Sequence, residues 1–388
     1  MIRFQTGTRD SRVNMKNKYI FLLTLPGLVG FFFFLSSSWM ETHSIPKKKI
    51  QINPIILSAA LEGEEKTKEF TFYNLPLDLD KAQIHDIIFY ADAMWIGSDK
   101  GLAKIKDKKL TLYKNFSDWP FEWSRYLVPT PHGIAVNIHV ANGNTGGNPA
   151  GSHIFHPDKE QWEKIGDNVL DQEWHDGYLY QASSKLIRRD PKKAWKEEPI
   201  LASLCHGGAS SLAMKAVNHE LWITGDGKTL QTHVDHSYGC GVIRYNPKRE
   251  ETVVYKKQDG LNHNYGWDLD GDRSGIFVSH SVKHNRLSFF NFNNGRWTSM
   301  EAVGSGNRIS ISSSEVWLAQ ATPSYPLRRI SRKGQDAHSF PAFFDKNEYV
   351  SAIGIDGLDV WFGVYEKHWQ DSTYTISSKL GHYTVSDP

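Results

Sequence analysis

The sequence predicts an all-β protein, most of it a seven-bladed β-propeller of four-stranded blades over residues 67–388. The first observation is a short apolar–aromatic–apolar–small motif that recurs seven times at a spacing of roughly 44 residues. The second is that each unit holds four short stretches of alternating apolar and polar residues, without a helical period after residue 66. Four-stranded sheets repeated at this period are propeller blades. A hydrophobic content of 39%, with 13 Trp, 16 Tyr and 20 Phe, is enough for a sizeable core and excludes general disorder.

The N-terminal part is expected to be separate from the propeller. Tyr19–Leu35 carries no charge, and the uncharged stretch continues to residue 40, just long enough for about 30 Å of hydrocarbon. Basic residues precede it, which favours an inside N-terminus and an exported body. We expect a basic cytoplasmic tail (1–18), a transmembrane helix or signal sequence (19–40) and a linker (41–66). A cleaved signal peptide is the alternative to a single-pass anchor, and both export the propeller to the periplasm or the extracellular space.

The repeat is defined by one central residue in each copy, which we call the anchor. The anchors are 40 to 55 residues apart: Trp95, Ala135, Tyr180, Trp222, Phe277, Trp317 and Trp361. An alternating stretch precedes each anchor, and another short strand follows it, often ending in Asp-Pro, Asn-Pro or Asn-Gly. A β-sandwich or two stacked all-β domains would not need an aromatic at a fixed period. The spacing therefore favours the propeller.

The unit QIHDIIFYADAMWIGSDKGLAKIKDKKLTLYKNF (83–116) resembles the two-component-regulator type of propeller repeat. KKQDGLNHNYGWDLDGDRSGIFVSH (256–280) is similar to the same pattern, and the other copies are weaker. The resemblance implies an extracytoplasmic propeller, often the sensory part of a signalling protein. About 18 residues before the apolar run cannot hold a kinase, so signalling would require a partner protein.

The ring is expected to close through an N-terminal strand. The last unit stops after its third strand, whereas EFTFYNLP (69–76) resembles a fourth strand without a blade of its own. Pairing of residues 69–73 with 381–385 would complete blade 7 and cover an open sheet edge.

Three blades carry insertions between their second and third strands, at 137–151, 224–240 and 364–379. Loops in this position emerge on one face of a propeller and can form a ligand surface, although they can also be tolerated surface variation. His233, Asp235 and His236 lie in the second insertion, and His206 precedes it. Imidazole coordinates transition metals and titrates near neutrality, so these are the candidates for acid–base catalysis, with His233 and His236 as weak metal candidates. A solvated surface loop is the alternative.

Other polar residues carry weaker signals. His85, Arg125 and Asn307 occupy equivalent strand starts and are expected near the channel. DLDGDRSG (268–275) begins like a calcium loop, but its twelfth position is Ser279 and no helices flank it, which favours an ordinary turn. Asn115 begins a glycosylation sequon, which has meaning only in a eukaryotic secretory route.

The two cysteines are expected to form a disulfide. Cys205 lies in the connection into blade 4, and Cys240 ends the insertion of that blade, so both belong to one face. An exported compartment permits oxidation. Two buried free thiols are the alternative.

The function that these features favour is a membrane-tethered, extracytoplasmic module that binds a protein, a glycan or a small molecule. The alternative is a propeller enzyme, a lyase or hydrolase, that uses the histidine-rich loop, with a divalent metal as an optional component. No cofactor is expected, since the chain lacks a P-loop, a dinucleotide fingerprint and a His-Glu-x-x-His motif. A net charge of +2 without a basic block in the body argues against nucleic acid as the partner.

Overall fold

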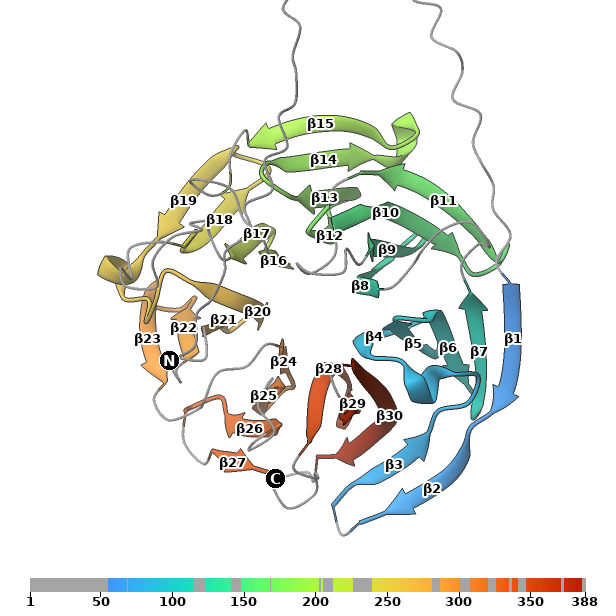
Figure 1. Ribbon diagram of the computed structural model, residues 1–388. Helices are drawn as coiled ribbons and strands as arrows, with labels where there is room; N and C mark the ends of the chain where they lie inside the picture. Colours follow the sequence, from blue (N-terminus) through green and yellow to red (C-terminus); the bar gives the residue numbers. More distant parts are fainter. Residues whose placement is uncertain are drawn as a thin grey trace, which may run out of the picture. The chain divides into compact units, whose positions relative to one another are not determined.

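Seven β-sheets stand around a central axis in the computed structural model (Figure 1). The fold is an all-β, seven-bladed propeller, as the repeat predicted. The structure describes residues 55–67, 69–114, 123–140, 148–167, 169–201, 204, 212–225, 239–280, 287–300, 308–319, 326–334, 337–340, 347–370 and 373–385.

The first strand of each blade lines the axis, and the second strand packs outside it (Figure 1). The first strands are β4 (Ile84–Tyr90), β8 (Trp123–Thr130), β12 (Asp171–His175), β16 (Leu212–Val217), β20 (Gly266–Asp272), β24 (Arg308–Ile311) and β28 (Glu348–Asp356). The second strands are β5 (Ala93–Ser98), β9 (Gly133–Val140), β13 (Tyr178–Ala182), β17 (Glu220–Gly225), β21 (Gly275–His280), β25 (Glu315–Ala319) and β29 (Asp359–Gln370). All seven anchors lie in second strands, which confirms the period.

The third and fourth strands form the outer half of each blade. The third strands are β6 (Gly101–Lys106), β10 (Asn148–His156), β14 (Leu186–Asp190), β18 (Val242–Asn246), β22 (Leu287–Asn291), β26 (Leu327–Ser331) and β30 (Thr373–Thr384). The fourth strands are β7 (Lys109–Lys114), β11 (Gln161–Gly166), β15 (Lys196–Leu201), β19 (Glu251–Tyr255), β23 (Arg296–Met300), β27 (His338–Ser339) and β3 (Thr71–Asn74). Neighbouring strands within a blade are antiparallel, so the chain crosses the ring from face to face four times per blade.

Six of the seven anchors are aromatic, because they fill the gaps between neighbouring blades; the exception is Ala135 of blade 2. Trp95 of blade 1 lies 5.8 Å, centroid to centroid, from Phe155 of blade 2. Trp222 of blade 4 lies 5.1 Å from Phe290 of blade 5. Among the described residues each of the seven interfaces between blades has one apolar cluster. The sequence repeat thus arises because each blade buries its apolar face only by packing against the next blade.

The ring closes through a strand from the N-terminal side, as expected. β3 pairs antiparallel with β30, with Phe72 opposite Gly381 (Figure 1). The paired residues are 71–74 and 379–382, and their bounds lie one to three positions from the predicted 69–73 and 381–385. Phe70, which is 1% exposed, fixes this register because its ring packs among Phe340, Phe362 and Tyr383.

Two further strands come from the segment expected to be a linker. β1 (Ile55–Ala60) pairs with β7 on the outer edge of blade 1. β2 (Glu62–Lys66) pairs with β3 on the outer edge of blade 7. The last part of residues 41–66 therefore bridges the first and last blades.

Helical structure within the described residues consists of three single turns, η1 (Leu79–Lys81), η2 (Pro191–Lys193) and η3 (Lys257–Asp259). None of the helices in this part of the chain is long and apolar enough to cross a membrane. The expected segment at 19–40 lies outside it.

Candidate functional site

The first strands enclose a central cavity of about 930 Å³. All seven blades contribute to its wall, from Asp86 in β4 to Ala352 in β28. Because the strands run along the wall, residues two apart in a strand point into the same space. The side chains therefore form rings, one residue from each blade.

The first ring consists of one residue from the first strand of each blade. Each of these residues pairs with the second-strand residue two positions after the anchor. Its members are Asp86, Arg125, Asp171, Ala213, Asp268, Arg308 and Ala352. A second ring lies directly opposite the anchors: Ile88, Val128, Glu173, Lys215, Asp270, Ser310 and Gly354. In the second ring blades 3 to 5 contribute charged residues, whereas blades 7, 1 and 2 contribute Gly354, Ile88 and Val128.

Three first-ring aspartates join neighbouring blades. The Asp86 carboxylate accepts a hydrogen bond from the backbone N–H of Ile87 (2.9 Å) and another from that of Leu127 in blade 2 (2.6 Å). Asp171 accepts from Gln172 in the same way, and from Met214 in blade 4. Asp268 accepts from Leu269 and, at 3.0 Å, from Ile309 in blade 6.

Burial raises the pKa of all three aspartates, and that of Asp268 reaches about 6. Arg308 opposes this rise at Asp86 and Asp268. Backbone hydrogen bonds offset part of the cost of burying these groups. The three aspartates are therefore structural residues of the channel wall.

The second ring contains a charged group built from blades 3, 4 and 5. The Lys215 ammonium lies 3.2 Å from the Asp270 carboxylate. Asp270, and then Glu173, raise the pKa of Lys215 in spite of burial. Burial raises the pKa of Glu173 to about 7, against the opposing effect of Lys215. This wall therefore changes its charge near neutral pH.

The expectation that His85 faces the channel is wrong by one residue. A β-bulge between Ile84 and Asp86 turns the next residue, Asp86, toward the axis. His85 is 3% exposed and pairs through Nε2 with Asp99 in the turn after the second strand. Arg125 holds the equivalent backbone register position in β8, opposite Asn137, but its side chain lies outside the described part of the chain, as does all of Asn307.

The segment 268–275 is neither a calcium loop nor simply a turn. Asp268, Asp270 and Asp272 belong to strand β20, so their two-residue spacing places all three on the channel wall. Asp272 accepts hydrogen bonds from Ser274 and pairs with Arg332 of blade 6 at 2.6 Å. The acidic pattern reflects a channel-facing strand and a cap on the turn that follows it.

The other predicted site residues lie outside the described part of the chain. These are His206, His233, Asp235, His236, Cys205 and Asn115. Their roles stay predictions. Cys240 is described and is 3% exposed, in the apolar cluster between blades 3 and 4.

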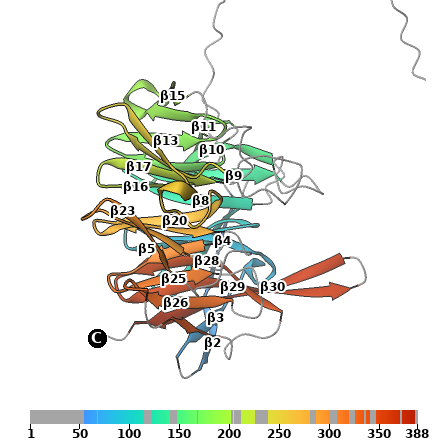
Figure 2. The ribbon, with the colours of Figure 1, turned by 90° about the vertical axis from the view of Figure 1, so that its left-hand side faces the viewer.

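The second strands β9, β17 and β29, which precede the three insertions, all end on one face of the ring, which we call the insertion face. In blade 7 the insertion is a continuation of β29 and β30, which form a hairpin that projects from the ring (Figure 2). Trp369 and Tyr374 pair across its two strands, with their ring centroids 5.1 Å apart. Their exposed fractions are 66% and 48%.

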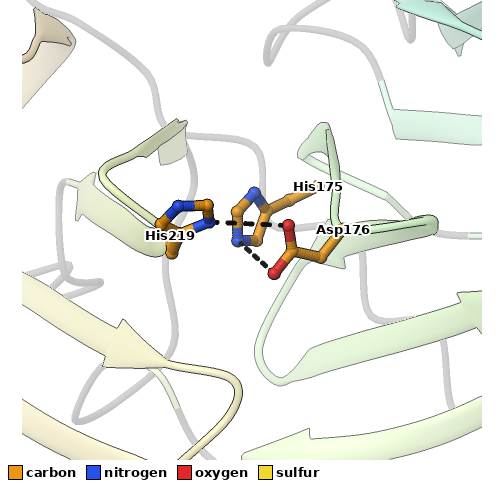
Figure 3. A group of neighbouring side chains, drawn as sticks. All are labelled: His175, Asp176 and His219. Atoms are coloured by element: carbon orange, nitrogen blue, oxygen red, sulfur yellow. Dashed lines mark ion pairs between the residues drawn. The ribbon is translucent and has the colours of Figure 1, made fainter.

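A group of metal-ligating side chains lies on the opposite face, at turns between first and second strands. His175 and Asp176 end β12 and begin the turn to β13, and His219 lies in the turn from β16 to β17 (Figure 3). One ligand atom from each lies within 4.8 Å of the others. No sequence motif marks this group, because two short turns 43 residues apart supply it.

No protein-family model matches the chain, and no curated protein matches its sequence. Solved structures match its fold. A chain of the crystal structure of the mitotic checkpoint complex matches with a TM-score of 0.54 at 11% identity, over 78% of this chain and 90% of that one. The computationally designed Ika8 protein matches with a TM-score of 0.50 at 10% identity, over 82% and 96%. The WD40 β-propeller domain of Doa1 matches at 0.48 and 10% identity, over 86% and 98%. At these identities the likeness shows the fold alone, a β-propeller.

Proposed function

We propose that this propeller binds a protein partner on its insertion face and that the β29–β30 hairpin is the main contact. The carrying observation is the exposed pair Trp369 and Tyr374 at the end of a projecting hairpin. Exposure of large apolar side chains to water is unfavourable, and their burial against a partner surface is therefore favourable for binding. Trp and Tyr are the residue types that contribute most to such contacts.

The shape of the hairpin favours a protein over a small molecule. Small ligands are enclosed in concave sites, whereas this aromatic pair lies on a projection (Figure 2). Lys367 extends over the Tyr374 ring at 5.0 Å, so a cation lies beside the apolar surface. The complementary partner therefore offers an apolar pocket with acidic groups at its rim.

A site-specific crosslink tests this proposal. A photoreactive residue in place of Trp369 in the full chain, expressed in its own cells, should capture one defined protein. The same residue in place of Val254, which is 47% exposed on β19, is the matched control and should not capture it. The purified partner should then bind the wild-type chain at least tenfold more tightly than a Trp369→Ala/Tyr374→Ala variant.

Equal binding of the captured protein to both forms would overturn the proposal. Lipid vesicles provide the opposing arm of the test, because Trp, Tyr and Lys also favour membrane interfaces. Loss of vesicle binding in the double variant, without loss of protein binding, would assign the hairpin to a membrane surface instead.

We further propose that the propeller is exported and tethered to a membrane. The charge-free run Tyr19–Leu35 and the basic residues before it support this placement. The repeat's resemblance to the two-component-regulator type agrees with it. A reporter that is active only outside the cytoplasm, fused after Pro388, should be active; activity of a cytoplasmic reporter at that position would contradict export. Alkaline extraction should leave the chain in the membrane fraction if the run is not cleaved.

A further inference from the structure

We infer that His175, Asp176 and His219 form a binding site for a divalent transition metal ion of the zinc type, which joins blades 3 and 4. Two imidazoles and one carboxylate are a common ligand set for such ions, whereas Mg²⁺ and Ca²⁺ prefer oxygen ligands alone. The site lies on the face opposite the hairpin and is independent of the proposed protein contact.

The distances between the ligand atoms are close to those that coordination needs. His175 Nε2 lies 3.5 Å from Asp176 Oδ2, and His219 Nδ1 lies 3.7 Å from Asp176 Oδ1 (Figure 3). Ligands about 2.0–2.1 Å from a tetrahedral ion are about 3.3 Å apart. All three ligand atoms lie within 4.8 Å of one another, so the side chains have to close by up to about 1.5 Å to share one ion.

His175 supplies an independent indication of a ligand. Its Nε2 atom is enclosed and forms no hydrogen bond with any described residue. An enclosed polar atom without such a bond is costly, and a bound cation would satisfy its lone pair.

The local backbone holds the ligands in place. Both turns have two residues with positive φ, 47° at Asp176 and 85° at Gly177, and 51° at Asn218 and 63° at His219. Turns of this kind are tight and fix the direction of their side chains. His219 is exposed, with a side-chain exposure of 71%, so an ion can enter from solvent.

A lysine competes for the same carboxylate. Lys248 Nζ lies 3.6 Å from Asp176 Oδ2, at the turn between the third and fourth strands of blade 4. The Lys248 ammonium offsets part of the negative charge of the Asp176 carboxylate, which would otherwise attract a metal ion. Removal of Lys248 should therefore strengthen metal binding, an effect that adventitious binding to surface histidines would not show.

The test uses the full chain in mild detergent, purified without a polyhistidine tag. Titration with Zn²⁺ should show one tight site, and Co²⁺ should give the visible absorption of a four-coordinate ion. His219→Ala and Asp176→Asn should each weaken binding at least tenfold, whereas Lys248→Ala should tighten it about threefold or more.

The control is His132→Ala, since His132 occupies the equivalent turn of blade 2 and contacts Trp174 and Trp195 rather than other ligands. A second control, His233→Ala/His236→Ala, separates this site from the histidine-rich insertion. Unchanged binding in His219→Ala would overturn the inference, as would loss of binding in the His233→Ala/His236→Ala variant. Both turn variants lie on the surface, so a matched unfolding temperature shows that they fold.

Discussion

The Asp86 carboxylate in blade 1 accepts a hydrogen bond of 2.6 Å from the Leu127 amide in blade 2. The same bond joins Asp171 to Met214 and Asp268 to Ile309. In each case the acceptor lies 41 to 43 residues before the donor, close to the repeat length. This bond thus connects blades 1 and 2, 3 and 4, and 5 and 6 at the axis, in addition to their apolar clusters.

Replacement of Asp171 by alanine should destabilise the propeller. The change leaves the amides of Gln172 and Met214 without their acceptor in a buried place, which costs about 2–4 kcal/mol of unfolding free energy. Urea unfolding of the purified chain measures this cost. Asp158→Ala, in an exposed turn, is the control and should change stability by less than about 0.5 kcal/mol. A loss as small as that at Asp171 would show that these bonds contribute little.

Glu173→Gln should alter how stability depends on pH. The folded chain holds a proton on Glu173 up to a pKa of about 7, whereas the unfolded chain releases it near its ordinary value of 4.5. At a pH between these two pKa values the folded chain binds a proton at Glu173 that the unfolded chain does not. The contribution of Glu173 to the free energy of unfolding therefore falls as pH rises. The variant should gain on the order of 1–2 kcal/mol over wild type between pH 5 and pH 8. A constant difference across this range would contradict the raised pKa.

Phe70→Ala should weaken the closure of the ring. Phe70 is buried between blades 6 and 7, and truncation of such a ring costs about 3–5 kcal/mol. Ile56→Ala on β1, where the side chain is 40% exposed, is the matched control and should cost less than about 1 kcal/mol. Thermal unfolding followed by near-UV dichroism reports both. Similar losses for the two variants would mean that β1 contributes as much to closure as β3.

Cys205 and Cys240 should be joined in the exported protein. A bridge across this loop stabilises by about 3–4 kcal/mol in the chain-entropy model. Peptide mapping without reduction should recover the two cysteines in one crosslinked fragment, and Cys240→Ser should lower the unfolding temperature. Two titratable thiols in the denatured, unreduced chain would exclude the bridge.

The sequence was sufficient to predict the propeller because burial at the second strand recurs in every blade. Trp95, Trp222 and Trp317 mark that position directly. Closure was also predictable, since residues 69–76 have the alternation of a fourth strand without a blade to complete. β1 and β2 were missed because neither alternates clearly: β1 (IILSAA) is almost wholly apolar, and β2 (EGEEK) is almost wholly charged.

The candidate sites were harder to predict. One bulged residue decides whether His85 or Asp86 faces the channel, and a bulge has no reliable signature in a single sequence. His175, Asp176 and His219 meet only because two neighbouring blades bring their turns together. The blade 7 insertion was expected as a loop, but its residues alternate well enough to extend both strands into a hairpin.

The pairing of β3 with β30 has a consequence for how the protein forms during synthesis. Among the described strands β3 is the third to emerge from the ribosome, but its inner neighbour, β30, is the last of them. Until then blade 7 lacks its three inner strands, and the apolar side chains of β3 remain without their final contacts. At about 5–20 residues per second the roughly 300 residues between them take on the order of 15–60 s. Throughout that interval the nascent chain presents an open sheet edge, which makes this stage the one at which a chaperone or a neighbouring copy can intervene.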